Sequence, residues 1–242
     1  MRILVISDIH ANLTALDAVL AAAGSVDEIW CLGDIVGYGP DPNECIARLR
    51  SLPNLVCLIG NHDSAALGNI DLNAFNREAR ASAHWTQSVL SAESRQFLYS
   101  LPERVVMQGV TLVHGSPRSP VWEYLLDPSS AYDNLAYFHT RLCFIGHTHI
   151  PVAFRMVDGM DEMEAELLKD GSTPAIEGRM FLNPGSVGQP RDHNPFAAFA
   201  IFTPETMLWR ARRVEYAVES VQERMRLVNL PTRLIHRLVE GW

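Results

Sequence analysis

Seven side chains that can bind a metal ion are spaced along residues 8–149. They are four imidazoles, two carboxylates and one amide: Asp8, His10, Asp34, Asn61, His114, His147 and His149. A lone histidine is more often structural, but seven such positions are too many for one tetrahedral ion and suit two ions that share a carboxylate, for which Asp34 is the candidate. We therefore expect two divalent ions, with Mn, Fe or Zn favoured and Ni or Co as alternatives.

The elements that must position these side chains are short apolar runs. Each candidate ligand follows directly on one of them, at residues 3–6, 29–32, 55–59, 110–113 and 142–145. Such runs are typical of buried strands. Because the carboxyl ends of strands line the ligand crevice of an α/β sheet, five successive strand ends would bring the ligands to one place.

Helical patterns separate the first strands. Residues 12–20 have a helical period with Asn12 as N-cap and Gly24 as stop, and residues 41–52 form a second helix opened by Pro42. Residues 64–101 are rich in alanine and polar side chains, which predicts a helical insertion that could overhang the site.

The pattern changes after Pro151. Further strands are expected at 152–157, 179–182, 196–202 and 207–213, with turns at 158–159 and 170–171, followed by helices at 215–227 and 232–239. The later strands would form a second sheet packed on the first. Residues 1–242 are interpreted as a single α/β domain.

Five motifs together resemble those of the calcineurin-like metallophosphoesterases. They are Asp8-x-His10, Gly33-Asp34, Gly60-Asn61-His62-Asp63, His114-Gly115 and Gly146-His147-x-His149. Residues 183–191 also resemble the closing motif of the small bacterial and archaeal phosphodiesterase branch. The resemblance implies a four-layer α-β-β-α sandwich, in which two mixed sheets are flanked by helices.

The same resemblance implies roles for the motif residues. One ion would be held by Asp8, His10, Asp34 and His149, and the other by Asp34, Asn61, His114 and His147. A water between the ions would become a hydroxide that attacks phosphorus in line. His62 would protonate the leaving group and Asp63 would orient its ring. Many members of the small branch carry another residue at this position, so the presence of His62 favours general-acid catalysis.

The choice of phosphoester is less constrained. Relatives that are Ser/Thr phosphatases or symmetrical dinucleoside tetraphosphatases carry phosphate-binding arginines next to the second and third motifs, whereas residues 35–39 and 58–60 contain none. This favours a phosphodiester or a small nucleotide-type substrate over a phosphomonoester or a dinucleoside polyphosphate. Arg191, in a loop rich in Gly and Pro, is a candidate phosphate ligand. The alternative is a non-catalytic interaction scaffold of the same fold. The complete set of metal ligands and the presence of His62 disfavour it.

The composition of the chain disfavours some classes of binding partner. A formal net charge of -8 disfavours binding to long duplex nucleic acid, and no apolar run is long enough to predict a membrane helix. The four cysteines lack C-x-x-C spacing and indicate reduced core thiols in a cytoplasmic protein. We expect a small phosphorylated partner, and the composition leaves the oligomeric state open.

Overall fold

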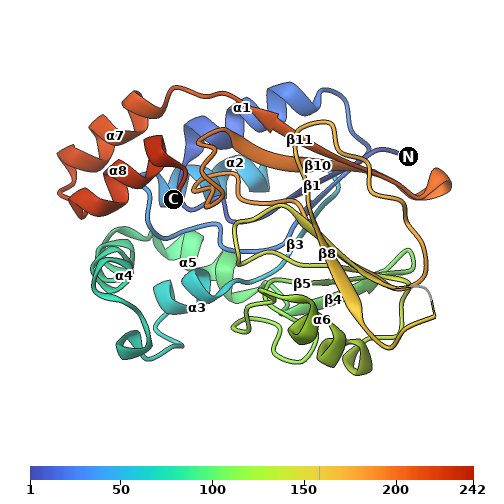
Figure 1. The fold of residues 1–242 in the computed structure, drawn as a ribbon. Helices are drawn as coiled ribbons and strands as arrows, with labels where there is room; N and C mark the ends of the chain where they lie inside the picture. Colours follow the sequence, from blue (N-terminus) through green and yellow to red (C-terminus); the bar gives the residue numbers. More distant parts are fainter. Residues whose placement is uncertain (158) are drawn as a thin grey trace.

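The structure is a computed structural model that describes residues 1–157 and 159–242. It confirms the expected fold class, because two mixed sheets pack face to face and helices cover the outer face of each (Figure 1). Among the described residues, no helix combines the length and apolar character needed to cross a membrane.

The first sheet has the strand order β11-β10-β1-β2-β3. Its strands are β1 (Ile3–Ile6), β2 (Glu28–Cys31), β3 (Leu55–Cys57), β10 (Ala197–Thr203) and β11 (Leu208–Val214). The strands β1, β2 and β3 are parallel, while β10 and β11 are antiparallel additions on the β1 side.

The second sheet has the strand order β4-β5-β6-β9-β7-β8. Its strands are β4 (Arg104–Met107), β5 (Val110–Val113), β6 (Leu142–Phe144), β7 (Val152–Met156), β8 (Met163–Leu167) and β9 (Met180–Asn183). The strands β5, β6 and β9 are parallel.

The predicted division of strands between the sheets is wrong. We expected the five early strands to form one sheet and the later strands to form the other, whereas β5 and β6 belong to the second sheet and β10 and β11 complete the first. Apolar content predicts that a run is buried but does not select its neighbour. The pairing of β1 with β10, in which Leu4 lies opposite Ile201, depends on a contact across nearly the whole chain.

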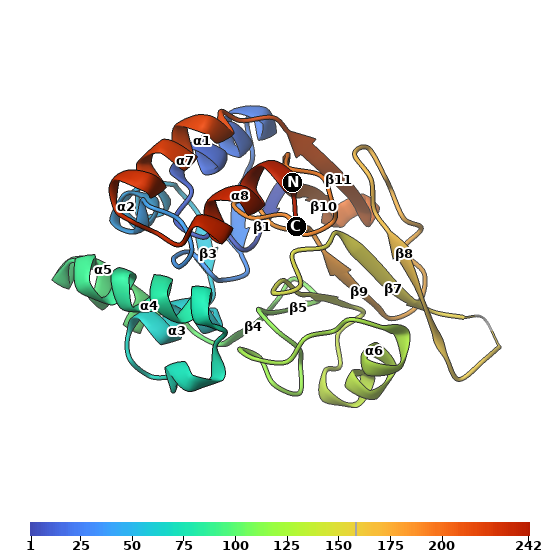
Figure 2. The same cartoon turned by 60° about the vertical axis from the view of Figure 1, so that its left-hand side comes forward.

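Helices form the outer layers. Around the first sheet lie α1 (Leu13–Ala23), α2 (Pro42–Arg50), α7 (Val218–Leu227) and α8 (Thr232–Glu240). On the opposite side of the molecule lies α6 (Pro128–Asn134), followed by the 3-10 turn η2 (Leu135–Tyr137) (Figures 1 and 2). The last 3-10 turn, η3 (Pro204–Thr206), joins β10 to β11.

Three apolar layers hold the four structural layers together, and β1 contributes to two of them. Leu4 and Ile6 face the helices α1, α7 and α8, while Ile3 and Val5 face the second sheet and pack in a cluster with Trp30, Phe144 and Trp209. This alternation follows from the two-residue period of a strand. A third cluster, which includes Phe138 and Phe154, lies between the second sheet and α6.

Local signals at the helix ends are confirmed. The side chain of Asn12 accepts a hydrogen bond from the backbone N–H of Ala15 at 3.0 Å, and Gly24 ends α1 with a φ of 66°. Pro42 opens α2, and the turn at 170–171 contains Gly171 with a φ of 81°. The turn expected at 158–159 includes residue 158, which lies outside the described residues.

The segment 64–101 contains the end of α3 (Asn61–Ala66), the 3-10 turn η1 (Leu72–Ala74), α4 (Arg77–Val89) and α5 (Ala92–Tyr99). The structure also contains β4, β8 and α6, which the sequence patterns did not predict. Both strands lie at sheet edges, and four of the five β8 residues are exposed.

Candidate metal centre

The seven candidate ligands lie together where the C-terminal ends of strands from both sheets meet. Asp8 and His10 follow β1, and Asp34 follows β2. The others are Asn61 at the start of α3, His114 after β5, and His147 and His149 after β6. None of the seven is more than 3% exposed. Polar groups buried to this extent require partners.

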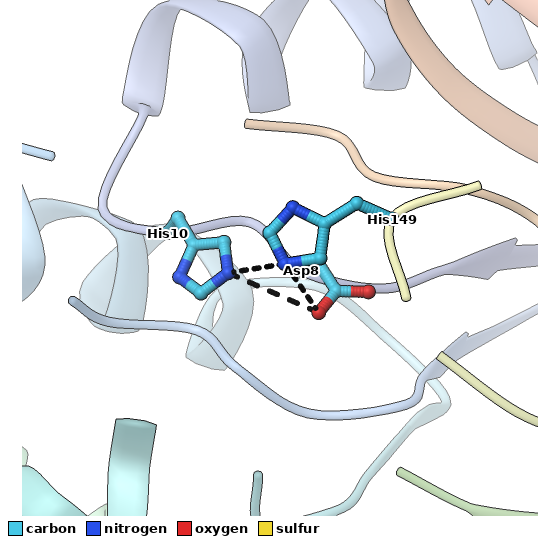
Figure 3. A group of neighbouring side chains, drawn as sticks. All are labelled: Asp8, His10 and His149. Atoms are coloured by element: carbon cyan, nitrogen blue, oxygen red, sulfur yellow. Dashed lines mark hydrogen bonds and ion pairs between the residues drawn. The ribbon is translucent and has the colours of Figure 1, made fainter. Parts of the chain in front are cut away.

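One group consists of Asp8, His10 and His149, whose ligand atoms face a common point (Figure 3). The Nε2 atoms of His10 and His149 are 3.0 Å apart. The Oδ1 atom of Asp8 lies 3.3 Å from Nε2 of His149 and 3.9 Å from Nε2 of His10.

The outer nitrogens of these two imidazoles fix their tautomers. Nδ1 of His10 lies 3.1 Å from the carbonyl oxygen of Val36, and Nδ1 of His149 lies 2.5 Å from that of Gln189. A carbonyl can only accept, so each Nδ1 carries the hydrogen and each Nε2 presents a lone pair to the common point. Two lone pairs that face each other repel, and a cation between them removes the repulsion.

A second group consists of Asp34, His114 and His147. Nε2 of His114 lies 3.3 Å from Oδ2 of Asp34 and 3.1 Å from Nδ1 of His147. The side-chain oxygen of Asn61 is 3.1 Å from the same nitrogen. Nδ1 of His114 lies 3.0 Å from the carbonyl oxygen of Leu32, which turns Nε2 toward the shared point.

Asp34 connects the two groups. Its Oδ2 atom lies 3.3 Å from Nε2 of His114 and 3.7 Å from Nε2 of His10, while its Oδ1 accepts a hydrogen bond from the backbone N–H of His62 at 2.8 Å. Within the described residues, Oδ2 of Asp34 and Oδ1 of Asp8 are buried without a hydrogen-bond partner. Carboxylate oxygens and imidazole lone pairs that converge in this way fit divalent metal ions.

The backbone that carries the ligands is strained. Asp8, His10, Asp34, His147 and His149 have φ values between 49° and 66°, in the left-handed region that side chains with a Cβ seldom adopt. Such residues cluster where a site needs a side chain to point in an unusual direction. Gly60 beside the site has no room for a side chain, because a Cβ at this position would lie 2.1 Å from Oδ1 of Asp34.

Burial and the neighbouring charges shift the pKa values of the ligands Asp34 and His114 in opposite directions. Burial acts to raise the pKa of Asp34, but the imidazoles of His114 and His62 outweigh it and hold that pKa well below its usual range. Burial acts to lower the pKa of His114, but the carboxylate of Asp34 outweighs it and raises the pKa to about 9. Burial raises the pKa of Asp8 to about 7. The ionised carboxylates therefore need positive charge beside them, which bound divalent ions would supply.

His62 lies at the edge of the metal centre. Its ring contacts those of Tyr38, Phe75 and His10, with centroids 4.3, 4.9 and 5.0 Å apart. Phe75 belongs to the loop between α3 and α4, so the predicted insertion reaches the site. Burial lowers the pKa of His62 to about 4.

Asp63 does not orient the His62 ring directly, which corrects our expectation. Its carboxylate accepts hydrogen bonds from the backbone N–H groups of Val36 at 3.0 Å and Gly60 at 2.9 Å. At the third position of α3, its side chain turns back toward the helix N-terminus, as in a capping box. Asp63 therefore holds in place the two backbone segments that carry Asp34 and Asn61.

Arg191 lies beside the first ligand group. Its backbone N–H donates to the carbonyl oxygen of His149 at 3.4 Å, and its Nη2 donates to the side-chain oxygen of Gln189 at 3.2 Å and to the hydroxyl of Tyr38 at 3.4 Å. These contacts hold the guanidinium over the rim of the metal centre.

Two residues that contact the site, Tyr124 and Phe75, were not predicted from the sequence. The ring of Tyr124 stacks on the ligand His147 with centroids 3.7 Å apart, and Phe75 contacts His62. Both come from loops without a recognisable motif, so their positions depend on the tertiary structure alone.

Residues 1–207 match the calcineurin-like phosphoesterase superfamily domain. The chain belongs to this superfamily. A solved metallophosphoesterase from Sphaerobacter thermophilus is 48% identical with a TM-score of 0.92, and the match covers 100% of this chain and 99% of that one. An uncharacterized protein of Methanocaldococcus jannaschii is 39% identical, with 99% of this chain and 98% of the relative covered.

A shorter match joins 24% of the chain to 22% of the symmetrical bis(5′-nucleosyl)-tetraphosphatase of Pseudomonas entomophila, at 37% identity over 62 residues. Membership of the superfamily confirms the resemblance seen in the motifs and places the chain among phosphoesterases.

Proposed function

We propose that this chain is a two-metal hydrolase of phosphoesters, acting on a phosphodiester or a small nucleotide-type substrate. The observation that supports this most directly is the position of Asp34, whose Oδ2 atom lies within 3.7 Å of Nε2 of His10 and within 3.3 Å of Nε2 of His114. A carboxylate in this position can serve two ions at once.

In this proposal Asp8, His10 and His149 hold one ion, His114, His147 and Asn61 hold the other, and Asp34 is shared. The mixture of imidazole, carboxylate and amide ligands suits manganese, iron or zinc. When bound, the two ions supply Lewis acidity that activates a water molecule and offsets the charge of the phosphoryl group.

The side chains of the protein complete the reaction. His62 donates a proton to the oxygen of the leaving group. Its pKa is lowered to about 4 by burial, so the protonated form requires the negative charge of a phosphoryl group bound beside it. Asp63 is a positioning residue, because its carboxylate holds the backbone of Val36 and Gly60 on either side of the metal centre.

Two observations support the substrate class. Residues 35–39 and 58–60 lack the arginines that would bind a terminal phosphoryl group, and Arg191 is directed to the rim of the centre instead. The short similarity to symmetrical bis(5′-nucleosyl)-tetraphosphatases supports a substrate of nucleotide type. The guanidinium of Arg191 would bind a phosphoryl oxygen.

The test compares hydrolysis of an aryl phosphodiester and of the matching aryl phosphomonoester. Wild-type protein is stripped of metal and then given manganese. The Asp34→Asn variant is treated in the same way, with Asp133→Asn on the exposed face of α6 as the matched control. We expect diesterase activity to return with manganese in the wild type and the control, and to fall at least about 100-fold in Asp34→Asn, which also loses both metals.

The metal content of each protein is measured by elemental analysis. Wild-type protein that binds two metals and hydrolyses neither ester would contradict the proposed enzyme and favour an interaction scaffold. Asp34→Asn protein that keeps both metals would show that the shared role of Asp34 is wrong.

A further inference from the structure

A cavity of about 410 Å³ opens beside the candidate metal centre. Its wall includes Thr148, which lies between the ligands His147 and His149. The other lining residues are Tyr124, Leu126, Ile150, Arg191, Arg237 and Trp242. Its volume is in the range of pockets that bind small organic ligands. The proposed function uses Arg191 at the rim and leaves the rest of this cavity unassigned.

Two guanidinium groups line the cavity without acidic partners. Among the described residues, no carboxylate lies within 4.0 Å of a nitrogen of Arg191 or Arg237. The Nε atoms of both are buried and lack a hydrogen-bond partner. Both side chains line the same cavity. Burial and then the positive charge of Arg191 lower the pKa of Arg237, whereas Tyr38, Tyr124 and Asp8 outweigh burial and raise the pKa of Arg191.

This arrangement is costly without a ligand. Two cations held near each other repel, and buried donors without acceptors destabilise the folded state. The chain as a whole has a formal net charge of -8, whereas these two neighbouring side chains are both positively charged. An anionic group bound between the guanidiniums would remove both costs, and phosphoryl oxygens match the planar donors of arginine.

Aromatic side chains flank the guanidiniums. Tyr124 is 44% exposed although its ring stacks on His147, and Trp242 is 49% exposed. The central carbon of the Arg237 guanidinium lies 5.6 Å from the centroid of the Trp242 ring. Exposed aromatic faces beside cations are the means by which proteins bind nucleobases next to phosphates.

The end of α8 is anchored against the loop that carries Arg191. The backbone N–H of His193 donates to the carbonyl oxygen of Gly241 at 2.7 Å. Gly241 has a φ of 65°, and a Cβ at this position would lie 2.6 Å from the backbone of Asn194. The contact therefore holds Arg237 and Trp242, from the far end of the sequence, beside the loop of Arg191.

We infer that this cavity binds the part of the substrate beyond the reacting phosphorus, with a second phosphoryl group on Arg191 and Arg237 and a nucleobase against Tyr124 and Trp242. The substrate is then a nucleotide with at least two linked phosphoryl groups. The net negative charge of the chain favours a free nucleotide over a nucleic-acid end. The inference rests on the proposed function, because the first phosphoryl group occupies the metal centre.

The test is calorimetric titration of manganese-loaded protein with ADP, AMP and pyrophosphate. ADP has two linked phosphoryl groups and a nucleobase. AMP lacks the second phosphoryl group, and pyrophosphate lacks the nucleobase. We expect ADP to bind at least about 10-fold more tightly than either, since each missing group removes a charge-assisted hydrogen bond or a stacking contact.

Three variants assign these differences to residues. Arg237→Gln should remove the preference for ADP over AMP, and Trp242→Ala should remove the preference for ADP over pyrophosphate. Arg233→Gln, an exposed arginine on the same helix, is the matched control and should keep both preferences. Circular dichroism and the melting temperature show that each variant is folded.

The inference is overturned if ADP binds no more tightly than AMP, or if Arg233→Gln and Arg237→Gln lower the affinity for ADP equally. The ligand preferences and the hydrolysis of the aryl phosphodiester are measured in separate experiments. A wild-type protein that cleaves the aryl ester and shows no preference for ADP would leave the proposed function intact and remove this inference alone.

Discussion

The imidazoles of the metal centre are oriented by backbone carbonyls. Val36 and Gln189 accept from the Nδ1 atoms of His10 and His149, so the two Nε2 atoms present lone pairs to the centre, and Leu32 accepts from Nδ1 of His114, whose Nε2 also faces the centre. This pattern distinguishes a metal site from a set of buried histidines that satisfy one another, because hydrogen bonds among neutral imidazoles would need a proton on one of the facing nitrogens.

His62 provides the residue-scale prediction. In His62→Ala protein we expect both metals to be retained, and kcat to fall by about 100-fold or more for an alkyl phosphodiester but much less for an aryl one. The reason is that a poor leaving group needs a proton, whereas a nitrophenolate does not. The measurement is kcat for a series of diesters with different leaving groups.

The control for His62→Ala is His84→Ala, which replaces an exposed histidine on α4. It should match the wild type throughout the series. Equal slowing of alkyl and aryl esters in His62→Ala would contradict the role of general acid and assign His62 to packing beside Tyr38 and Phe75.

At the scale of elements, the insertion supports the site through particular contacts. Phe75, before α4, packs on His62, and the hydroxyl oxygen of Ser82 on α4 accepts a hydrogen bond from the backbone N–H of Tyr38 at 2.6 Å. Tyr38 in turn contacts His62 and Arg191. The helix α4 therefore fixes Tyr38, the residue that contacts both the candidate acid His62 and the candidate phosphate ligand Arg191.

Ser82→Ala tests this connection. The substitution leaves the buried N–H of Tyr38 without an acceptor, so we expect the free energy of unfolding to fall by about 1–3 kcal/mol. Denaturant titration measures it. The control is Ser88→Ala on the same helix, where the exposed hydroxyl donates only to the carbonyl of Trp85, and its effect should stay within about 0.5 kcal/mol. Equal effects of the two substitutions would show that α4 does not support the Tyr38 loop.

At the scale of the whole molecule, the metal centre joins the two sheets. Asp8, His10 and Asp34 follow strands of the first sheet, whereas His114, His147 and His149 follow strands of the second. Bound ions would cross-link the sheets at one edge, in addition to the apolar layer that includes Trp30, Phe144 and Trp209. Ligand binding of this kind stabilises the folded state by mass action.

Removal of the metals should therefore lower the melting temperature. Free metal at about 100 times its dissociation constant contributes about 2.7 kcal/mol per site, so two sites contribute about 5 kcal/mol, which corresponds to roughly 10–20 °C for a chain of this size. Scanning calorimetry with chelator and then with added manganese measures the shift. Asp34→Asn should show a much smaller shift, and a wild-type melting temperature that is insensitive to chelator would contradict the cross-link.

The motifs predicted both the family and the fold class, and both are confirmed. The caps of α1 and the opening of α2 were also predicted, because they depend on neighbouring residues such as Asn12 and Pro42. The edge strands β4 and β8 were missed, although β8 alternates apolar and charged residues and β4 contains three consecutive apolar residues. The partner of β1 could not be predicted from local sequence, because β10 lies about two hundred residues away.

The sequence by itself determined which residues are chemically able to bind metal, since ligand type and strand-end spacing are local properties. Only the tertiary structure decided that the strand ends come from two sheets and that Asp63 binds backbone instead of His62. It alone brought Arg237 and Trp242 beside Tyr124. Contacts between distant segments depend on how whole layers pack, and no local pattern of residues encodes that packing.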